Sequence, residues 1–379
     1  MKILHITKKY PNALGGDAVY VLNLENEQRK NSHDVFILTS NCKEIISKTG
    51  LYKFGLKDTA QNWDRIRFKR IISTLFFLFY LPFIIHKIKP DIIHVHSVEL
   101  GCFASWWAKL FRIPTIFTYH AVLFPYKDIN FIKRLFDFLF FSLGIFDKII
   151  AVDVNSLSHF GNYYLRAVFI PPAVNPEEFC LNGTQTPSFK KQSSFNKIIR
   201  FLYVGRLEET KGLYNLLEAT KLFMNYCDNF ELYIVGDGSL RVKLENLSRK
   251  LNLNNIVKFL GPVSDRIKLV EIYHSADIFV LPSLRDFCPV VIFEAWAAGL
   301  ALIATKVGSI TTICQHYHNA YLISPNNIIM LAEALLELYS DNELRLNLAR
   351  NGITTVKQRY TWEIISKQIQ QLYTEILTQ

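Results

Sequence analysis

The stretch Ala276–Gly299, ADIFVLPSLRDFCPVVIFEAWAAG, is largely apolar, yet it carries two carboxylates beyond its strand-like start, Asp286 and Glu294. The apolar run at its start predicts a buried strand, and the segment after the loop predicts a helix from Pro289 that stops at Gly299. In an open α/β sheet, ligands bind beyond the carboxyl ends of the strands. The two acids are therefore either a helix cap and a solvated helix residue, or part of a ligand site.

Outward from this stretch, β-rich runs alternate with helical runs along the chain. The first half contains KILHIT, HDVFILTS, DIIHVHS, PTIFTYH and KIIAVD, and the second half contains IIRFLYVG, FELYIVG, IVKFLG, DIFVLPS and ALIAT. Such alternation predicts parallel sheets with crossover helices, an α/β fold. The polar stretch 181–197 divides the two series, so we expect two doubly wound, Rossmann-like domains, 1–185 and 186–361. The amphipathic helix 362–379 is expected to pack back on the first domain.

The bulk composition indicates a cytoplasmic protein. Its 379 residues are 50% hydrophobic, enough for two cores. The first residues lack the apolar run of a secretory signal. The six cysteines are scattered without a close pair, so the sequence suggests neither a disulfide framework nor a zinc site.

Positive charge is concentrated in the first half. Residues 1–200 contain 26 Lys plus Arg against 15 Asp plus Glu, a net charge of +11, whereas residues 201–379 have a net charge of −1. Such a surplus suggests an anionic partner, either nucleic acid or a membrane surface. Because the chain has no helix-turn-helix, zinc-finger or RNA-sheet motif, nucleic acid is not expected.

Two Phe-rich runs, 71–85 and 131–146, lie among these basic residues. Both are shorter than the roughly 20 apolar residues that a spanning helix needs. They are either buried helices or surfaces that rest on an anionic membrane, on its inner face. The basic residues that would contact such a membrane are Arg65, Arg67, Lys69, Arg70, Lys133 and Arg134.

The segment VGRLEETKG, 204–212, places Arg206 after a predicted strand and Lys211 before a predicted helix. Two cations beside a helix N-terminus favour an anion, because the unpaired N–H groups and the helix dipole also attract it. This segment therefore suggests a phosphate site. The alternative is that both cations pair with Glu208 and Glu209 on the surface.

Glycines and histidines provide weaker signals at other strand ends. Gly15 and Gly16 follow the first strand, and Gly236 lies in the similar turn VGDGS; such glycines let backbone N–H groups approach a phosphate. His120 lies at the end of a predicted strand, where a side chain can reach a ligand. His94 and His96 alternate in IIHVHS and therefore share one face, with packing or hydrogen bonding as the alternative role.

Taken together, these motifs resemble the retaining glycosyltransferases of family 4, which use nucleotide sugars and have the two-domain GT-B fold. The resemblance rests on seven stretches that occur in the same order: YPNALGGDAVYV, PDIIHVHS, TYH, VGRLEETKG, IVGDGSLR, VKFLGPVSD and ADIFVLPSLRDFCPVVIFEAWAAGLALIATKVGS. It implies a hexosyltransferase that moves a sugar from a UDP- or GDP-sugar to a glycan, with the acceptor expected to be lipid-linked and destined for a surface polysaccharide. The donor would lie between the two domains.

The resemblance also implies a role for each candidate residue. Arg206 and Lys211 would hold the diphosphate, with Gly15, Gly16 and Gly236 beside it. Glu294 would accept hydrogen bonds from the ribose. Asp286 and the backbone N–H groups of Phe287 and Cys288 would contact the transferred sugar, and His120 would reach that sugar from the first domain. Neither a cofactor nor a metal ion is expected, because the two cations would neutralise the diphosphate.

Two departures from the family pattern leave alternatives open. Asp286 stands where the family usually has Glu, and Phe287 stands where it usually has a small residue. One alternative is a catalytically silent binding subunit at the membrane. Another is a nucleotide-sugar epimerase with the same architecture, which would release a free sugar without an acceptor.

Overall fold

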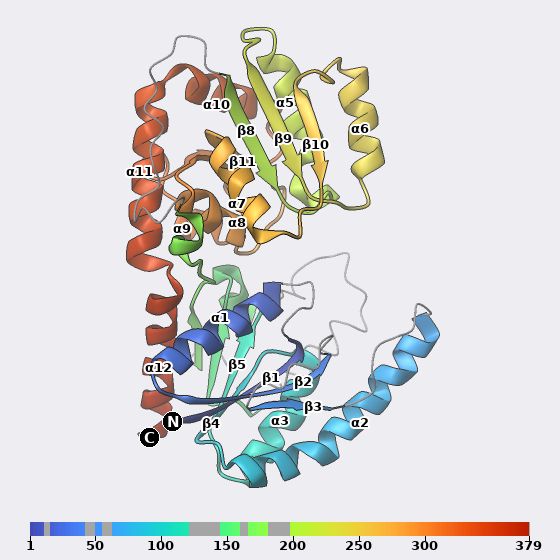
Figure 1. Cartoon of the computed structure of the whole chain (residues 1–379), viewed down its shortest axis with the longest axis vertical. Coiled ribbons are helices and arrows are strands. Elements are labelled where there is room, and N and C mark those ends of the chain that lie inside the picture. The colour runs from blue at the N-terminus through green and yellow to red at the C-terminus, as the bar shows by residue number, and fades with distance from the viewer. Residues whose placement is uncertain are drawn as a thin grey trace. The chain divides into compact units, whose positions relative to one another are not determined.

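The computed structural model describes residues 1–10, 16–41, 50–54, 63–120, 145–159, 166–180 and 198–378. They form two compact units, Met1–Pro172 with Trp362–Gln379, and Ala173–Thr361 (Figure 1). The first unit ends at Pro172 rather than at residue 185, because Val174 bridges to Thr361 and Phe179 lies in the core of the second unit. The linker expected at 181–197 lies outside the described residues.

The first unit is built on a parallel sheet, and its described strands have the spatial order β3-β2-β1-β4-β5-β6-β7. They are β1 (Lys2–Lys9), β2 (Asp34–Asn41), β3 (Leu51–Lys53), β4 (Ile92–Val95), β5 (Thr115–Tyr119), β6 (Lys148–Ala151) and β7 (Ala167–Phe169). β4 and β5 are buried along their whole length, as expected when helices cover both faces of a parallel sheet. The strand order reverses between β1 and β4, and ligands bind at such points in doubly wound sheets.

The last helix of the chain belongs to this first unit. The unit's described helices are α1 (Gly16–Lys30), α2 (Trp63–Ile88), α3 (Val98–Leu110) and α12 (Trp362–Leu377), with the 3-10 helix η1 (Val154–His159). α12 packs beside α1 (Figure 1). The amide of Gln28 donates to the hydroxyl of Tyr373 at 3.1 Å, and the rings of Tyr20 and Trp362 meet edge to face.

The second unit repeats the same topology, with the strand order β10-β9-β8-β11-β12-β13. Its strands are β8 (Ile199–Val204), β9 (Phe230–Val235), β10 (Val257–Gly261), β11 (Ile278–Leu281), β12 (Ala301–Thr305) and β13 (Tyr321–Ile323). Its helices are α5 (Leu213–Phe223), α6 (Arg241–Lys250), α7 (Arg266–Ser275), α8 (Val290–Ala297), α9 (Ile310–Ile313), α10 (Ile328–Ser340) and α11 (Asn342–Arg359), with η3 (Pro176–Phe179) and η5 (Glu209–Lys211). Two parallel sheets with crossover helices confirm the predicted α/β fold.

The helix predicted from Pro289 is α8, and it lies within the core of the second unit. Pro289 is its N-cap, and Gly299 beyond its end has a φ of +79°. Trp296 is fully buried, and its indole N–H donates to the carbonyl of Asn319 at 2.9 Å. A Cβ at Gly352 of α11 would lie 2.3 Å from the Trp296 ring, so this glycine lets α11 pass close over α8.

The Phe-rich segment 71–85 falls in α2, and its described side chains divide between two environments. Phe77 and Leu81 are buried, whereas Phe79 is 76% exposed. None of the described helices is both long and apolar enough to cross a bilayer. Most of the second Phe-rich segment, residues 131–144, lies outside the described part of the chain, as do Lys133 and Arg134.

Candidate functional site

Two residues from separate sequence motifs, Lys211 and Asp286, form an ion pair in the second unit. The Nζ atom of Lys211 lies 2.6 Å from Oδ2 of Asp286, and both side chains are largely buried. Lys211 ends the turn after β8, and Asp286 lies in the loop after β11. Since β8 and β11 are neighbours at the point where the strand order reverses, the pair occupies the usual ligand position of a doubly wound sheet.

Backbone contacts hold these two loops together. The amides of Leu284 and Arg285 both donate to the carbonyl of Thr210, at 2.8 and 3.1 Å. Gly212 has a φ of +67°, and a Cβ at this position would lie 2.0 Å from the carbonyl oxygen of Pro282. A side chain there would push the loops apart, so the glycine keeps Lys211 within reach of its partner.

Two further glycines allow equally close approaches between loops. A Cβ at Gly236 would lie 1.9 Å from the carbonyl oxygen of Gly205, and a Cβ at Gly308 would lie 2.0 Å from that of Asp286. Both residues have a positive φ. In this structure Gly236 therefore packs the loop after β9 against the loop after β8, and its contact with a phosphate stays a prediction.

Arg206 lies in a different environment from Lys211. Its side chain is 71% exposed, and Nη1 lies 2.8 Å from Oε1 of Glu208. This is the surface pairing that the sequence left open as an alternative for Arg206. Because an exposed ion pair contributes only about 0–1 kcal/mol, the guanidinium can exchange Glu208 for an anionic ligand at small cost.

The carboxylate of Asp286 organises its own loop. Its Oδ2 atom accepts a hydrogen bond from the Ser283 hydroxyl at 3.0 Å, and its Oδ1 atom accepts one from the Phe287 amide at 3.1 Å. The resemblance implied that the Phe287 amide contacts a sugar hydroxyl, but here this N–H is directed at Asp286. The neighbouring Cys288 is partly buried.

Glu294 is buried, so it is not the solvated helix residue that the sequence left open. Its Oε1 atom accepts a hydrogen bond from Nη1 of Arg266 at 2.7 Å, and its Oε2 atom accepts one from the Tyr273 hydroxyl at 2.8 Å. Arg266 also bonds to Glu178 through Nε at 3.0 Å. The buried face of α8 thus holds a carboxylate that is paired with a cation and bonded on both oxygens.

Electrostatics keep the partners of Glu294 in the protonation states that bond to it. Burial acts to lower the pKa of Arg266, but Glu294 and Glu178 outweigh it and raise this pKa above its ordinary value. Burial, and then the charge of Glu294, raise the pKa of Tyr273 well above its usual value. Both side chains therefore remain hydrogen-bond donors at neutral pH.

Sequence reasoning missed Arg266. It is the first residue of α7, where a charged side chain is usually solvated, and it follows the N-cap Asp265. Its role depends on Glu178 and Glu294, which are distant from it in sequence. The N-cap Asp265 accounts for the start of this helix but gives no indication of the pairing.

The described candidate residues of the first unit, Gly16 and His120, lie at the carboxyl edge of its sheet. Gly15 lies outside the described residues, and Gly16 is the first residue of α1. His120 directly follows β5, and its ring lies edge-on to that of Tyr20 with centroids 4.7 Å apart. Burial lowers the pKa of His120 to about 4, so the imidazole is neutral at pH 7.

His94 and His96 share one face of the sheet, as the alternation predicted, with ring centroids 4.2 Å apart. Both are buried and hydrogen-bonded to other side chains of the first unit. They therefore fill the hydrogen-bonding role that the sequence left open for them.

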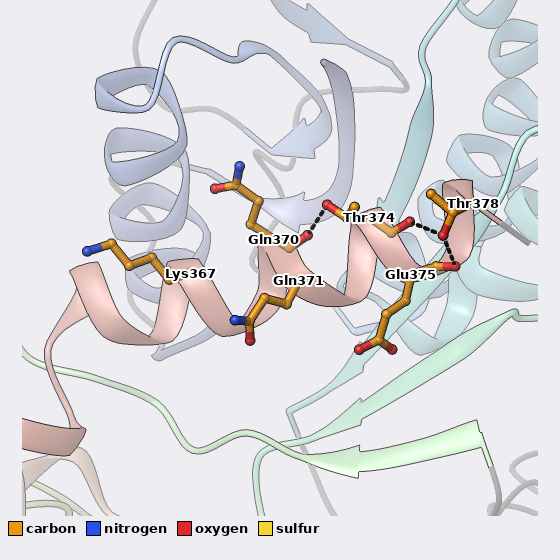
Figure 2. Close-up of a pocket in the computed structure, with 6 residues that line it drawn as sticks. All are labelled: Lys367, Gln370, Gln371, Thr374, Glu375 and Thr378. Carbon is orange, nitrogen blue, oxygen red and sulfur yellow. Dashed lines mark hydrogen bonds between the residues drawn. The ribbon is translucent and has the colours of Figure 1, made fainter.

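A shallow hollow along α12 contains none of the predicted site residues (Figure 2). Its lining comes from this one helix: Lys367, Gln370, Gln371, Thr374, Glu375 and Thr378. The hydroxyls of Thr374 and Thr378 donate to carbonyls of their own helix. With no polar groups converging from other elements, this hollow is a weaker ligand candidate than the loops after β8 and β11.

Comparison with known proteins gives two family matches that together span most of the chain. Residues 14–178 match the model of Glycosyltransferase Family 4, and residues 184–355 match that of Glycosyl transferases group 1. An uncharacterized glycosyltransferase of Methanocaldococcus jannaschii is 25% identical, over 98% of each chain. The lipopolysaccharide core biosynthesis glycosyltransferase LpsD of Rhizobium meliloti is 23% identical, over 97% of this chain and 96% of that protein.

A further relative and two solved structures agree with these matches. The UDP-Gal:alpha-D-GlcNAc-diphosphoundecaprenol alpha-1,3-galactosyltransferase of Escherichia coli is 26% identical, over 73% of this chain and 74% of that protein. The sucrose-phosphate synthase of Thermosynechococcus elongatus has a TM-score of 0.78 at 20% identity, with 100% of this chain and 99% of that chain covered. HepE of Anabaena in complex with UDP has a TM-score of 0.77 at 17% identity, with coverages of 99% and 100%.

Proposed function

Because the chain belongs to the family 4 glycosyltransferases with the GT-B fold, we propose that it transfers a hexose or related sugar from a UDP- or GDP-sugar to a glycan hydroxyl. Relatives named for lipopolysaccharide core synthesis and for a diphosphoundecaprenol acceptor support a lipid-linked acceptor in surface polysaccharide synthesis. The proposed reaction retains the configuration at the transferred sugar. The protein is proposed to act in the cytoplasm, on the inner face of the membrane.

The observation that carries this proposal is the pairing of Lys211 with Asp286 at the reversal point of the second sheet. A lysine ammonium has three N–H donors, and Asp286 engages one of them, so the others can bind a phosphate oxygen. Arg206 on the same loop can leave Glu208 for the diphosphate. A sugar diphosphate bound here would place its phosphates on the cations and its sugar beside Asp286.

The same geometry supports a ribose site at Glu294. Each carboxylate oxygen has two lone-pair positions, and Arg266 and Tyr273 each occupy one. The remaining positions can accept hydrogen bonds from two ribose hydroxyls. The ion pair with Arg266 keeps the carboxylate charged, and hydrogen bonds to a charged group are the stronger ones.

In the proposed reaction, the bond between the sugar's anomeric carbon and the diphosphate oxygen breaks, and a bond to the acceptor oxygen forms. The acceptor hydroxyl releases its proton to solvent, and the diphosphate leaves with one additional negative charge. Arg206 and Lys211 stabilise that charge, so the proposed mechanism uses no metal ion or cofactor. That Gly16 and His120 also contact the donor, through a backbone N–H and an imidazole, stays a prediction.

A thermal-shift panel with UDP, GDP and several of their sugars tests this proposal. A ligand at a hundred times its Kd adds about 2.7 kcal/mol to stability, which raises the melting temperature. We expect one nucleotide series to stabilise the wild type and to lose most of its effect in Lys211→Ala. The control Lys250→Ala removes an exposed charge at the end of α6 and should respond like the wild type. No stabilisation by either series would contradict a nucleotide-sugar donor.

A further inference from the structure

A cluster of histidines lies on one face of the first sheet. His5 of β1 stands opposite His94 of β4 in the strand register, and His96 follows two residues later on the same face. All three are buried, and their nitrogens come within 4.8 Å of one another, close enough for a metal ion to be considered. Every ring nitrogen of the three, however, lies 2.6–3.2 Å from a protein partner. A metal would have to break these bonds, so the cluster is better described as a hydrogen-bonded chain.

The hydrogen-bonded chain connects Gln28 of α1 to His120 at the end of β5. Nε2 of His5 lies 2.7 Å from Oε1 of Gln28, and Nδ1 of His5 lies 2.9 Å from Nε2 of His96. Nδ1 of His96 in turn lies 3.2 Å from Nε2 of His120. On its other side, the Gln28 amide lies 3.1 Å from the hydroxyl of Tyr373 on α12.

Distances at Gln28 determine the direction of this chain. With its oxygen toward His5, the 2.7 Å contact is an ordinary N–H···O bond, and the 3.1 Å contact to Tyr373 is an ordinary amide-to-hydroxyl bond. With the amide reversed, the second contact would join two oxygens at 3.1 Å, beyond the usual O–H···O range of about 2.5–3.0 Å. The carbonyl oxygen of Gln28 therefore faces His5 and accepts a hydrogen bond from its Nε2–H.

We propose that Gln28 fixes the tautomer of His120 through His5 and His96. Gln28 requires a proton on Nε2 of His5, which leaves Nδ1 of His5 as an acceptor. A neutral imidazole has one donor and one acceptor nitrogen, so His96 must then carry its proton on Nε2, and His120 likewise. His120 is left with a bare Nδ1 that accepts hydrogen bonds. Gln28, His5 and His96 are thus positioning residues for His120, and Tyr373 holds the Gln28 amide in place.

The ligand that this tautomer of His120 would bind rests on the proposed function. His120 directly follows β5 at the carboxyl edge of the sheet, where a bare Nδ1 would accept a hydrogen bond from a ligand hydroxyl. It would not donate to a phosphate or carboxylate oxygen. The hydrogen-bonded chain of histidines therefore leaves His120 able to bind a sugar hydroxyl rather than an anionic group.

Nitrogen-15 NMR of histidine-labelled, ligand-free protein tests the tautomers directly. The signals of His5, His96 and His120 are assigned among those of the ten histidines with His5→Gln, His96→Gln and His120→Gln. In the wild type, we expect His5, His96 and His120 all to carry their protons on Nε2. A proton on Nδ1 of His120 would overturn the proposal, and this result needs no variant to fold.

Two substitutions at Gln28 separate a positioning role from simple packing. Gln28→Lys replaces the acceptor facing His5 by a donor, so it should reverse the chain and move the proton of His120 to Nδ1. Gln28→Met has similar length without a donor or acceptor and should give a mixture of tautomers. The control Thr118→Val removes a partner of His94 outside the path to His120 and should leave the His120 tautomer unchanged.

An unchanged His120 tautomer in folded Gln28→Lys would show that Gln28 does not control it. Because the spectra are recorded without ligand, the tautomers are decided independently of donor binding. Failure of the thermal-shift panel with the predicted tautomers present would count against the proposed function alone. Donor binding with the opposite tautomer would count against the histidine chain alone.

Discussion

Lys211 and Arg206 carry the same charge five residues apart, yet their side chains are held differently. Lys211 is buried against Asp286, whereas Arg206 lies in an exposed pair with Glu208. Removing Lys211 therefore leaves a largely buried carboxylate without its cation, while removing Arg206 disturbs only a surface contact. The two residues share a proposed role in binding diphosphate, but only Lys211 also supports the fold of the site.

At Glu294, the structure predicts a specific loss of nucleotide binding. Glu294→Gln keeps the shape of the side chain but removes the charge that strengthens its hydrogen bonds. Such bonds contribute about 1.5–3 kcal/mol, so we expect the Kd for UDP or GDP to rise at least tenfold. Isothermal titration calorimetry with the free nucleotide measures this change.

Tyr273→Phe is the matched control for this experiment. It removes a hydrogen bond to the same carboxylate from the protein side and leaves the charge in place. We expect it to lower stability while leaving the nucleotide Kd close to that of the wild type. Equal affinities in Glu294→Gln and the wild type would show that Glu294 has only a structural role with Arg266.

Individual residues of the site were predictable where they belong to local motifs. Lys211 and Asp286 each follow a recognisable strand, and the parallel sheet brings the two strand ends together. Arg266 and His5 were missed, because their roles depend on partners that are distant in sequence. The surface pairing of Arg206 with Glu208 was foreseen only as one of two alternatives.

At the scale of elements, α8 was predicted nearly to the residue because Pro289 and Gly299 mark its two ends. The strands β3, β7 and β13 were missed. Each has three residues, too few to show a period of two. They lie at or beside the edges of their sheets, so their formation depends on a neighbouring strand rather than on their own sequence.

α2 carries an exposed aromatic stripe, so its described part is neither a fully buried helix nor evenly solvated. Phe76, Phe79 and Phe83 are spaced along one helix face and are 59%, 76% and 59% exposed. The opposite face is buried through Phe77, Leu81 and Ile84. The basic segment Arg65–Arg70 lies earlier in the same helix. An apolar stripe beside basic residues is typical of a helix that rests on an anionic membrane surface.

We therefore predict reversible, salt-sensitive binding to anionic vesicles. Each basic residue near such a surface contributes about 1 kcal/mol, and an inserted aromatic stripe adds a contribution that salt does not screen. In co-sedimentation at low and high salt, a variant should lose the salt-sensitive part of vesicle binding when six basic residues are changed to Ser: Arg65, Arg67, Lys69, Arg70, Lys133 and Arg134. Phe79→Ser should weaken the binding that remains at high salt.

The control for the membrane experiment is Ile329→Ser, which removes an apolar side chain that is 65% exposed on α10 of the second unit. It should bind vesicles like the wild type. If the wild type sediments equally with neutral and anionic vesicles at low salt, the basic surplus of the first half has another role.

At the scale of the whole molecule, the histidine cluster makes stability depend on pH. Burial lowers the pKa of His5 and His120 to about 4, and those of His94 and His96 well below their usual value of 6.5. Below pH 6.5 the unfolded chain takes up protons that the folded chain excludes. Stability is thus complete above pH 6.5 and falls as the pH drops toward 4, by about 1.4 kcal/mol per pH unit for each ring.

Urea unfolding between pH 7.5 and 5 measures this dependence. Burial acts to raise the pKa of Glu231, but its bonds to Lys258 and Arg200 outweigh burial and lower this pKa to about 2. The contribution of Glu231 to stability is therefore lost only below the chosen pH window. The window excludes this carboxylate, and burial of His316, which lowers its pKa, adds a further histidine contribution there. His5→Gln should reduce the slope, and His86→Gln on the exposed side of α2 should not. A flat profile in the wild type would mean that the four rings are not held neutral by the fold.

Release of UDP or GDP from sugar donors shows whether the loops after β8 and β11 bind a nucleotide sugar for transfer. We predict acceptor-stimulated release by the wild type, with Arg206→Ala and Lys211→Ala each lowering turnover about a hundredfold or more, as expected for losing one preorganised charge contact. Arg206→Ala should keep the wild-type melting temperature, so its loss would be catalytic. Turnover within about threefold of the wild type in both variants, a decrease too small for the loss of such a contact, would show that Arg206 and Lys211 do not stabilise the leaving diphosphate.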